Sequence, residues 1–205
     1  MKYNTCFFER YASLVIREFL GERYANLENI DRPDLQDNTL GIGIEVTRAI
    51  QENKNFANSL INDMAADEIL KVDKSLLSDI QRFGYAYGLE GDFLGHYEYD
   101  YWNLALPFHR VVESKVRKVI GGFYGDYKEF GLFVFSKENL QIDDIYKAMN
   151  FTVDLQQGER LHYDFLFVNQ SDHLFVCDLQ KKEISRYNLT IDQRRDFFIR
   201  SAVGE

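Results

Sequence analysis

The stretch PDLQDNTLGIGIEVT, residues 33–47, decides the fold of this chain. Pro33 has no N–H to donate, so a strand in this place begins near it or runs along the edge of a sheet. Asp37-Asn38 is typical of a turn. The residues after the turn alternate between apolar side chains (Ile42, Ile44, Val46) and a second set (Gly41, Gly43, Glu45, Thr47). The stretch therefore predicts two neighbouring strands joined by a tight turn.

Helical and strand-like patterns continue on both sides of this pair. The spacing of apolar residues predicts helices over 4–20 and 107–120, ended by Gly21 and by Gly121-Gly122. Further strands are expected at 131–135, 163–168 and 174–179, with a helix over 143–149 and a short terminal helix capped by Thr190. This order predicts an α/β (α+β) fold in which helices flank a central mixed sheet.

The chain is expected to form a single domain, residues 1–205, with an insertion or lid at about 50–105. The first part of that segment, up to residue 82, has helical spacing, and the rest is rich in Gly and Tyr without a clear period. No Pro- or Ser-rich linker flanks it, which favours an attachment to the core over a separate domain.

Composition limits the classes of function. The net charge of −9 argues against a protein that coats nucleic acid over its whole surface, although a local basic strip is compatible with it. The two cysteines have no CxxC spacing, so we expect neither a disulfide framework nor a zinc site. No apolar run of about 18 residues and no signal-peptide pattern is present, so a cytoplasmic location and no membrane partner are expected.

Two carboxylates carry the chemistry of the predicted strand pair. Asp34 lies near the start of the first strand and Glu45 near the end of the second, and antiparallel pairing can bring them together at one edge. Carboxylates held close together repel one another, and a divalent cation offsets that repulsion. Mg²⁺ is commonly held by one or two carboxylates together with water and substrate phosphate. The pair therefore predicts a metal site.

Pro33-Asp34, followed after a short turn by Glu45-Val46-Thr47, resembles the PD-(D/E)XK nuclease superfamily. The segment GIEVT, residues 43–47, is similar to uncharacterised prokaryotic and phage members that carry the same strand. The likeness extends over the preceding helix and on to residues 107–135. It implies a restriction-endonuclease-like core and a Mg²⁺- or Mn²⁺-dependent nuclease, with DNA favoured over RNA as its partner. It also implies that Asp34, Glu45 and the carbonyl of Val46 bind the metal.

The resemblance suggests one further acidic residue on the first helix. Glu9 shares a helical face with apolar residues, so its carboxylate can point toward the sheet and join the metal's first or second shell. Glu18 and Glu22 are rivals for that role, although the pattern favours solvated side chains for both.

Thr47 departs from the superfamily pattern, which has lysine there to orient or activate the attacking water. A hydroxyl cannot supply a positive charge at neutral pH. In this superfamily the lysine can move to the following helix, where Lys115 and Lys118 lie at the edge of the apolar face. The alternative is a catalytically inactive nuclease fold that binds DNA or another protein. The sequence leaves open the strandedness of the nucleic acid and whether the chain forms a homo-oligomer.

Overall fold

The computed structural model describes residues 5–49, 107–136 and 139–204. The chain divides into two compact units, residues 1–48 with 114–205 and residues 49–113. The expected insertion or lid at 50–105 lies outside the described residues. The elements, in chain order, are α1 (Thr5–Leu20), the 3-10 helix η1 (Glu22–Tyr24), β1 (Glu28–Asn29), β2 (Leu35–Asp37), β3 (Ile42–Ala49), α5 (Pro107–Ile120), β4 (Glu129–Ser136), α6 (Ile142–Leu155), β5 (Phe165–Asn169), β6 (His173–Asp178), β7 (Glu183–Asn188) and α7 (Ile191–Val203).

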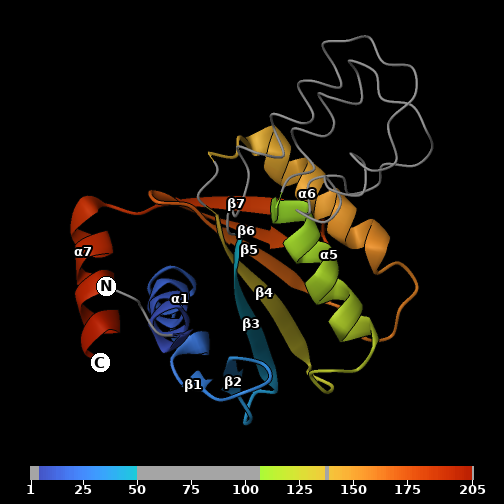
Figure 1. Cartoon of the computed structure of the whole chain (residues 1–205), viewed down its shortest axis with the longest axis horizontal. Coiled ribbons are helices and arrows are strands. Elements are labelled where there is room, and N and C mark those ends of the chain that lie inside the picture. Colours follow the sequence, from blue (N-terminus) through green and yellow to red (C-terminus); the bar gives the residue numbers. More distant parts are fainter. Residues whose placement is uncertain (1–4, 50–106, 137–138, 205) are drawn as a thin grey trace, which may run out of the picture. The chain divides into compact units, whose positions relative to one another are not determined.

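The described strands form one mixed seven-stranded sheet in the order β1-β2-β3-β4-β5-β6-β7 (Figure 1). The first pairs, β1 with β2 and β2 with β3, are antiparallel. Strands β4 and β5 are parallel and are joined through α6, whereas β5, β6 and β7 pair antiparallel. The expected α/β class with a helix-flanked mixed sheet is confirmed.

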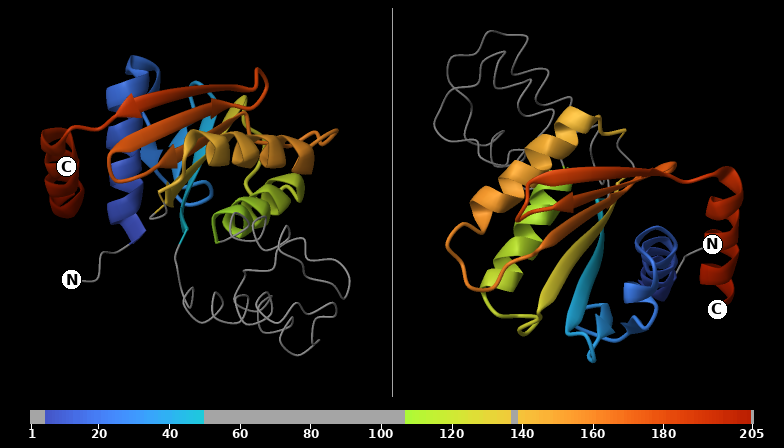
Figure 2. Two further views of the ribbon diagram at one scale, coloured as in Figure 1. Left: turned by 90° about the horizontal axis from the view of Figure 1, so that it is seen from above. Right: turned by 180° about the vertical axis from the view of Figure 1, so that it is seen from behind.

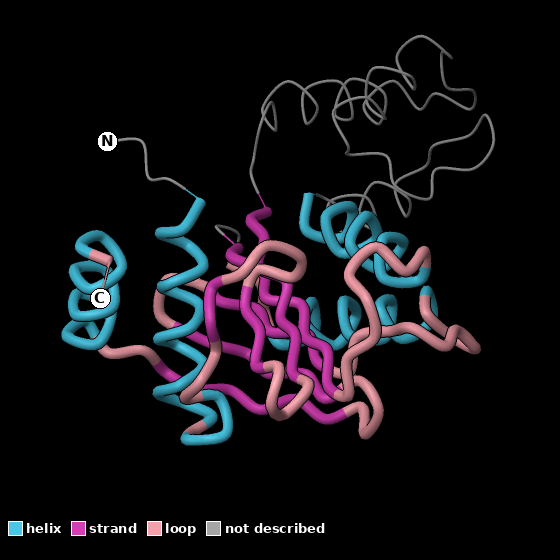
Figure 3. Tube along the Cα trace, turned by 90° about the horizontal axis from the view of Figure 1, so that it is seen from below, coloured by secondary structure: helices cyan, strands magenta, loops and turns pink. Residues whose placement is uncertain are grey.

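Helices cover both faces of this sheet. Figure 2 shows α7 lying beside α1, and Figure 3 shows the strands in magenta with helices on either side. The core between the sheet and α1 contains Val15 and Ile16 from the helix and Ile42 and Ile44 from β3, all at most 1% exposed. Because side chains alternate along a strand, the neighbours Gly43 and Glu45 belong to the opposite face of β3.

The helix ends follow the glycines that the sequence indicates. Gly21, with a φ of 81°, follows α1, and Gly122, with a φ of 73°, follows α5. After α5, the Gly122 N–H donates to the Val119 carbonyl and the Phe123 N–H donates to the Lys118 carbonyl. This pair of bonds is a Schellman motif, which requires the left-handed conformation that glycine adopts readily. At α7, Thr190 caps the helix as expected and its hydroxyl accepts from the Gln193 N–H.

Three expectations were incomplete. Helix α6 extends to Leu155, beyond the predicted end at 149, because the buried Thr152 satisfies its hydroxyl on the Ala148 carbonyl and continues the buried face. Strand β7 was not predicted, since its side chains are mostly exposed and lack apolar alternation. Strand β1 is only two residues long, too short to show a period.

None of the helices in the described ranges combines the length and the apolar character that crossing a bilayer requires.

Gly43 of β3 is packed closely against the side chains of Tyr127 and Pro33. It pairs with Gln36 of β2, and a Cβ at this position would lie 2.9 Å from the Tyr127 ring and 3.0 Å from Cγ of Pro33. The Tyr127 hydroxyl donates to Oε1 of Gln36 at 3.0 Å, which holds the ring over the glycine. The absence of a side chain at Gly43 therefore allows Pro33 and Tyr127 to close over β3.

Replacing Gly43 with alanine is expected to lower the free energy of unfolding by about 1–3 kcal/mol, because the added methyl overpacks a tight site. Chemical denaturation monitored by circular dichroism measures the change. Gly158→Ala is the control. A Cβ added at Gly158 would have no heavy atom within 4 Å, and the φ of this residue is 79°, so that variant reports backbone strain without overpacking. An unchanged denaturation midpoint for Gly43→Ala would contradict the close packing of Pro33 and Tyr127.

Candidate functional site

The pairing of β2 with β3 places Asp34 opposite Glu45. Leu35 pairs with Ile44 in the antiparallel register, so the residue before Leu35 faces the residue after Ile44. Oδ2 of Asp34 accepts a hydrogen bond of 2.7 Å from the Val46 N–H, which fixes this carboxylate against β3. The expectation that the two acidic residues come from neighbouring segments of one sheet agrees with this register. Glu45 lies within β3, however, since that strand continues to Ala49.

Lys115 reaches this pair from α5. Its Nζ lies 2.5 Å from Oε1 of Glu45, and the side chains of Lys115 and Glu45 are 18% and 8% exposed. Lys115 is the second residue of the part of α5 that belongs to the first unit, and Val116 and Val119 of the same helix are buried. Its aliphatic stem therefore crosses packed surface and delivers the ammonium to the carboxylate.

The environment of Asp34 favours its protonated form. Burial and the negative charge of Glu45 raise the pKa of Asp34 from an ordinary 3.8 to about 7. The charge of Glu9 adds to this effect, whereas the Val46 N–H and the ammonium of Lys115 oppose it. The single ammonium of Lys115 therefore does not offset the combined effect of burial and the neighbouring carboxylates on the pKa of Asp34.

The remaining predicted residues take separate positions. Glu9 of α1 is half-buried and accepts a 2.6 Å hydrogen bond from the side-chain amide of Asn29 in β1. Its negative charge contributes to the raised pKa of Asp34. Thr47 is half-buried on β3, two residues after Glu45. Lys118 does not contact the acidic pair: it is exposed, and its ammonium lies over the Phe123 ring. Of the rivals to Glu9, Glu18 instead contacts Gln193 of α7.

Two tyrosines that the sequence did not single out complete the buried side of the site. Tyr124, 5% exposed, and Tyr163, fully buried, both have pKa values raised above the ordinary 10.0, chiefly by burial. The charges of Glu45 and Asp34 contribute to both shifts, which shows that the phenols lie near the carboxylates. Among the described residues, neither hydroxyl has a partner in hydrogen-bond geometry, although Tyr124 approaches both Glu45 and Tyr163. The two phenols therefore stay neutral and remain available as donors.

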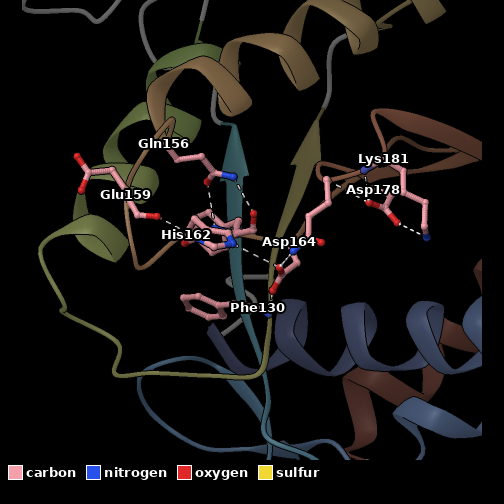
Figure 4. A network of polar contacts seen from close by, with 9 residues as sticks. Phe130, Gln156, Glu159, His162, Asp164, Asp178 and Lys181 are labelled. Atoms are coloured by element: carbon pink, nitrogen blue, oxygen red, sulfur yellow. Dashed lines mark hydrogen bonds and ion pairs between the residues drawn. The ribbon is translucent and has the colours of Figure 1, made fainter.

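Figure 4 shows Gln156 and Asp164 in a network of polar contacts around the segment that contains Tyr163. The buried Gln156 side chain donates to the Tyr163 carbonyl at 2.7 Å and accepts from the Tyr163 N–H at 3.0 Å. The next residue, Asp164, accepts from the Phe130 N–H at 2.8 Å and from the Gln180 amide at 2.8 Å. This network joins the segment before β5 to β4. It therefore fixes the backbone that carries the Tyr163 ring. A sequence pattern cannot reveal such a contact, because Gln156 and Tyr163 lie outside the acidic motif.

The donors present suit a hard divalent cation. Within the described ranges, no group of three or more His, Cys, Asp or Glu side chains is arranged to hold a metal ion. Mg²⁺ does not need such a cage, since it is commonly bound by one or two carboxylates and retains several waters. Asp34 and Glu45 supply that number of carboxylates, so this donor set is one that Mg²⁺ or Mn²⁺ can take.

The raised pKa of Asp34 predicts how stability depends on pH. The folded chain binds the Asp34 proton more tightly than the unfolded chain does, so without divalent cations stability falls as pH rises from about 4 through about 7. Asp34→Asn keeps an oxygen to accept from Val46 and removes the charge. In EDTA, this variant should melt several degrees above the original chain at pH 8 and show no such gain at pH 4.5.

The matched control for this prediction is Asp126→Asn, whose parent carboxylate is 65% exposed and pairs with Arg160 at the surface. It should not stabilise the chain at pH 8. Adding Mn²⁺ at pH 8 should reverse the order, because only the chain that retains Asp34 gains stability by binding the ion. Equal melting temperatures for Asp34→Asn and the original chain across the pH range would contradict the electrostatic description of the site.

Comparison of the chain with protein-family models, with curated proteins and with solved structures gives no match. A function for this site therefore has to be argued from the chemistry of its own residues.

Proposed function

We propose that this chain is a metal-dependent nuclease that hydrolyses phosphodiester bonds of nucleic acid, with DNA as the favoured substrate. The observation that carries the proposal is the contact between Lys115 and Glu45, 2.5 Å from Nζ to Oε1, beside Asp34. It supplies an ammonium group at the acidic pair, where Thr47 provides none. The order of α1, the strand pair, α5 and β4 is also the order that the resemblance to the PD-(D/E)XK superfamily implies.

Each residue has a distinct role in this proposal. Asp34, Glu45 and the Val46 carbonyl would hold Mg²⁺ or Mn²⁺, with Glu9 in a supporting position. The bound ion would stabilise the charge that develops at phosphorus and lower the pKa of the attacking water. Lys115 would orient that water and stabilise negative charge in the transition state. The neutral phenol of Tyr124 would donate to Glu45 and keep that carboxylate in place.

The competing function is a catalytically inactive nuclease fold that binds DNA or another protein. Thr47 favours it, and so does the direct pairing of Lys115 with Glu45, because such an ion pair can be purely structural. A structural ion pair requires Glu45 and Lys115 but not Asp34. The burial of Asp34 next to Glu45 disfavours its ionised form in the folded chain. The acidic pair as a whole therefore favours the enzyme.

The first test separates metal binding from chemistry. Glu45→Ala should abolish both Mn²⁺ binding, measured by calorimetry, and cleavage of labelled nucleic acid, because the ion depends on that carboxylate. Lys115→Ala should retain Mn²⁺ binding and lower kcat by about 10²-fold or more, the range expected for one positioned acid–base or electrostatic group. Lys147→Ala is the control: it removes an exposed ammonium from α6 and should leave kcat unchanged.

The second test introduces a lysine on β3, at the position where the superfamily pattern has one. Thr47→Lys places an ammonium two residues after Glu45, on the same face of the strand. In the Lys115→Ala background it should recover at least part of the lost cleavage rate, measured under single-turnover conditions. If the original chain cuts no DNA or RNA with either ion, and Thr47→Lys cuts no faster, the enzyme is excluded and the inactive fold is left.

A further inference from the structure

An exposed aromatic ring with two cations is formed by residues that are close in sequence to those of the candidate site. Phe123 is 50% exposed, although a phenylalanine that follows a Schellman motif ordinarily packs against the helix it ends. The Lys118 ammonium lies 5.2 Å from the centre of its ring, and the Arg32 guanidinium carbon lies 5.3 Å from it. We call Arg32, Lys118 and Phe123 the Phe123 patch.

Each member of the patch lies within three residues, along the chain, of a residue of the candidate site. Arg32 comes two residues before Asp34, Lys118 lies one helical turn after Lys115, and Phe123 precedes Tyr124. The Lys118 contact is local, since the Phe123 N–H donates to the Lys118 carbonyl within the helix cap. The Arg32 contact is not local, because it joins the segment before β2 to the end of α5. The helix cap therefore does not account for the patch.

Arg32 is also held in a strained conformation. Its φ is 65°, in the left-handed region that residues other than glycine rarely adopt. Residues in such conformations gather at functional sites, where the surrounding structure holds them. The Arg32 side chain is 63% exposed and its one described ion pair, to the 84% exposed Asp31 at 3.3 Å, is open to solvent. Its guanidinium is thus accessible to a ligand.

We propose that the Phe123 patch binds single-stranded nucleic acid, with an unpaired base stacked on Phe123 and the flanking phosphates contacted by Arg32 and Lys118. A phenylalanine ring has no polar atoms and cannot read base edges, so the contact tolerates any sequence. Within a duplex, the faces of the bases are covered by their neighbours, so a ring cannot stack on them and only the base edges and the backbone remain accessible. The inference rests on the proposed function, because it assigns to that active site a substrate that is single-stranded near the bond to be cut.

Binding is measured with the full chain in EDTA, so that no cleavage is required. Fluorescence anisotropy compares a labelled single-stranded DNA 12-mer with the duplex of the same sequence. The original chain should bind the single strand more tightly than the duplex. Phe123→Ala should weaken binding of the single strand by about 10-fold, within the range for loss of one stacking contact, and Phe123→Trp should restore it.

The control for exposure is Phe198→Ala, because Phe198 of α7 is 43% exposed but lies far from the site in the chain. It should bind like the original chain. Arg32→Gln and Lys118→Ala should each weaken binding and reduce the slope of log K against log salt by about 0.7, the value for one phosphate contact with a single strand. Circular dichroism melts check that every variant is folded.

The outcomes for the patch and for the enzyme are distinguishable. Phe123-dependent binding of single strands without cleavage in Mg²⁺ or Mn²⁺ supports the patch and overturns the nuclease. Cleavage with an unchanged Phe123→Ala variant supports the nuclease and overturns the patch. Equal affinity for single strand and duplex, or no binding of nucleic acid at all, also overturns the assignment of the patch.

Discussion

The antiparallel pairing of β2 with β3 is the constraint on which the candidate site depends. Leu35 opposite Ile44 buries two apolar side chains in the core against α1. The same register places Asp34 opposite Glu45, and the bond from the Val46 N–H to Asp34 continues the pairing beyond the end of β2. A shift by one residue would exchange the faces of β3 and bring Glu45 into the apolar core. The burial of Ile42 and Ile44 therefore sets the position of the carboxylates.

The two carboxylates of the site, Asp34 and Glu45, destabilise the folded chain when both are ionised. Two carboxylates are held near one lysine, and burial with repulsion raises the pKa of Asp34 to about 7. Charge repulsion of this kind has no structural benefit in a site that could hold apolar residues instead. The cation proposed for this site would relieve that repulsion. Two buried phenols, Tyr124 and Tyr163, add polar groups that are influenced by the charges of these carboxylates.

Local patterns in the sequence were enough to predict the strand pair, α1, α5 and the acidic residues, because each depends on periodicity, glycine or proline over short distances. The side of the site that consists of Tyr124 and Tyr163 was not predictable in this way. Tyr163 is placed by the paired hydrogen bonds of Gln156, a contact whose partners have no motif. Strand β7 was missed for a related reason: its pairing with β6 comes from backbone bonds, while its side chains show no alternation. The expected insertion at 50–105 lies outside the described residues.

Lys115 and Lys118 show what separates a residue of the site from its neighbour in the chain. The sequence places both at the edge of the apolar face of α5, and three positions apart they differ by a rotation of roughly 60° about the helix axis. That rotation turns Lys115 toward β3 and Glu45, where it is 18% exposed, and turns Lys118 toward the end of the helix and the Phe123 ring. One helix thus presents a half-buried ammonium to Glu45 and an exposed ammonium to solvent beside an aromatic ring. The half-buried position suits a charge that acts on reacting atoms, and the exposed position suits a charge that holds a flexible, anionic ligand nearby.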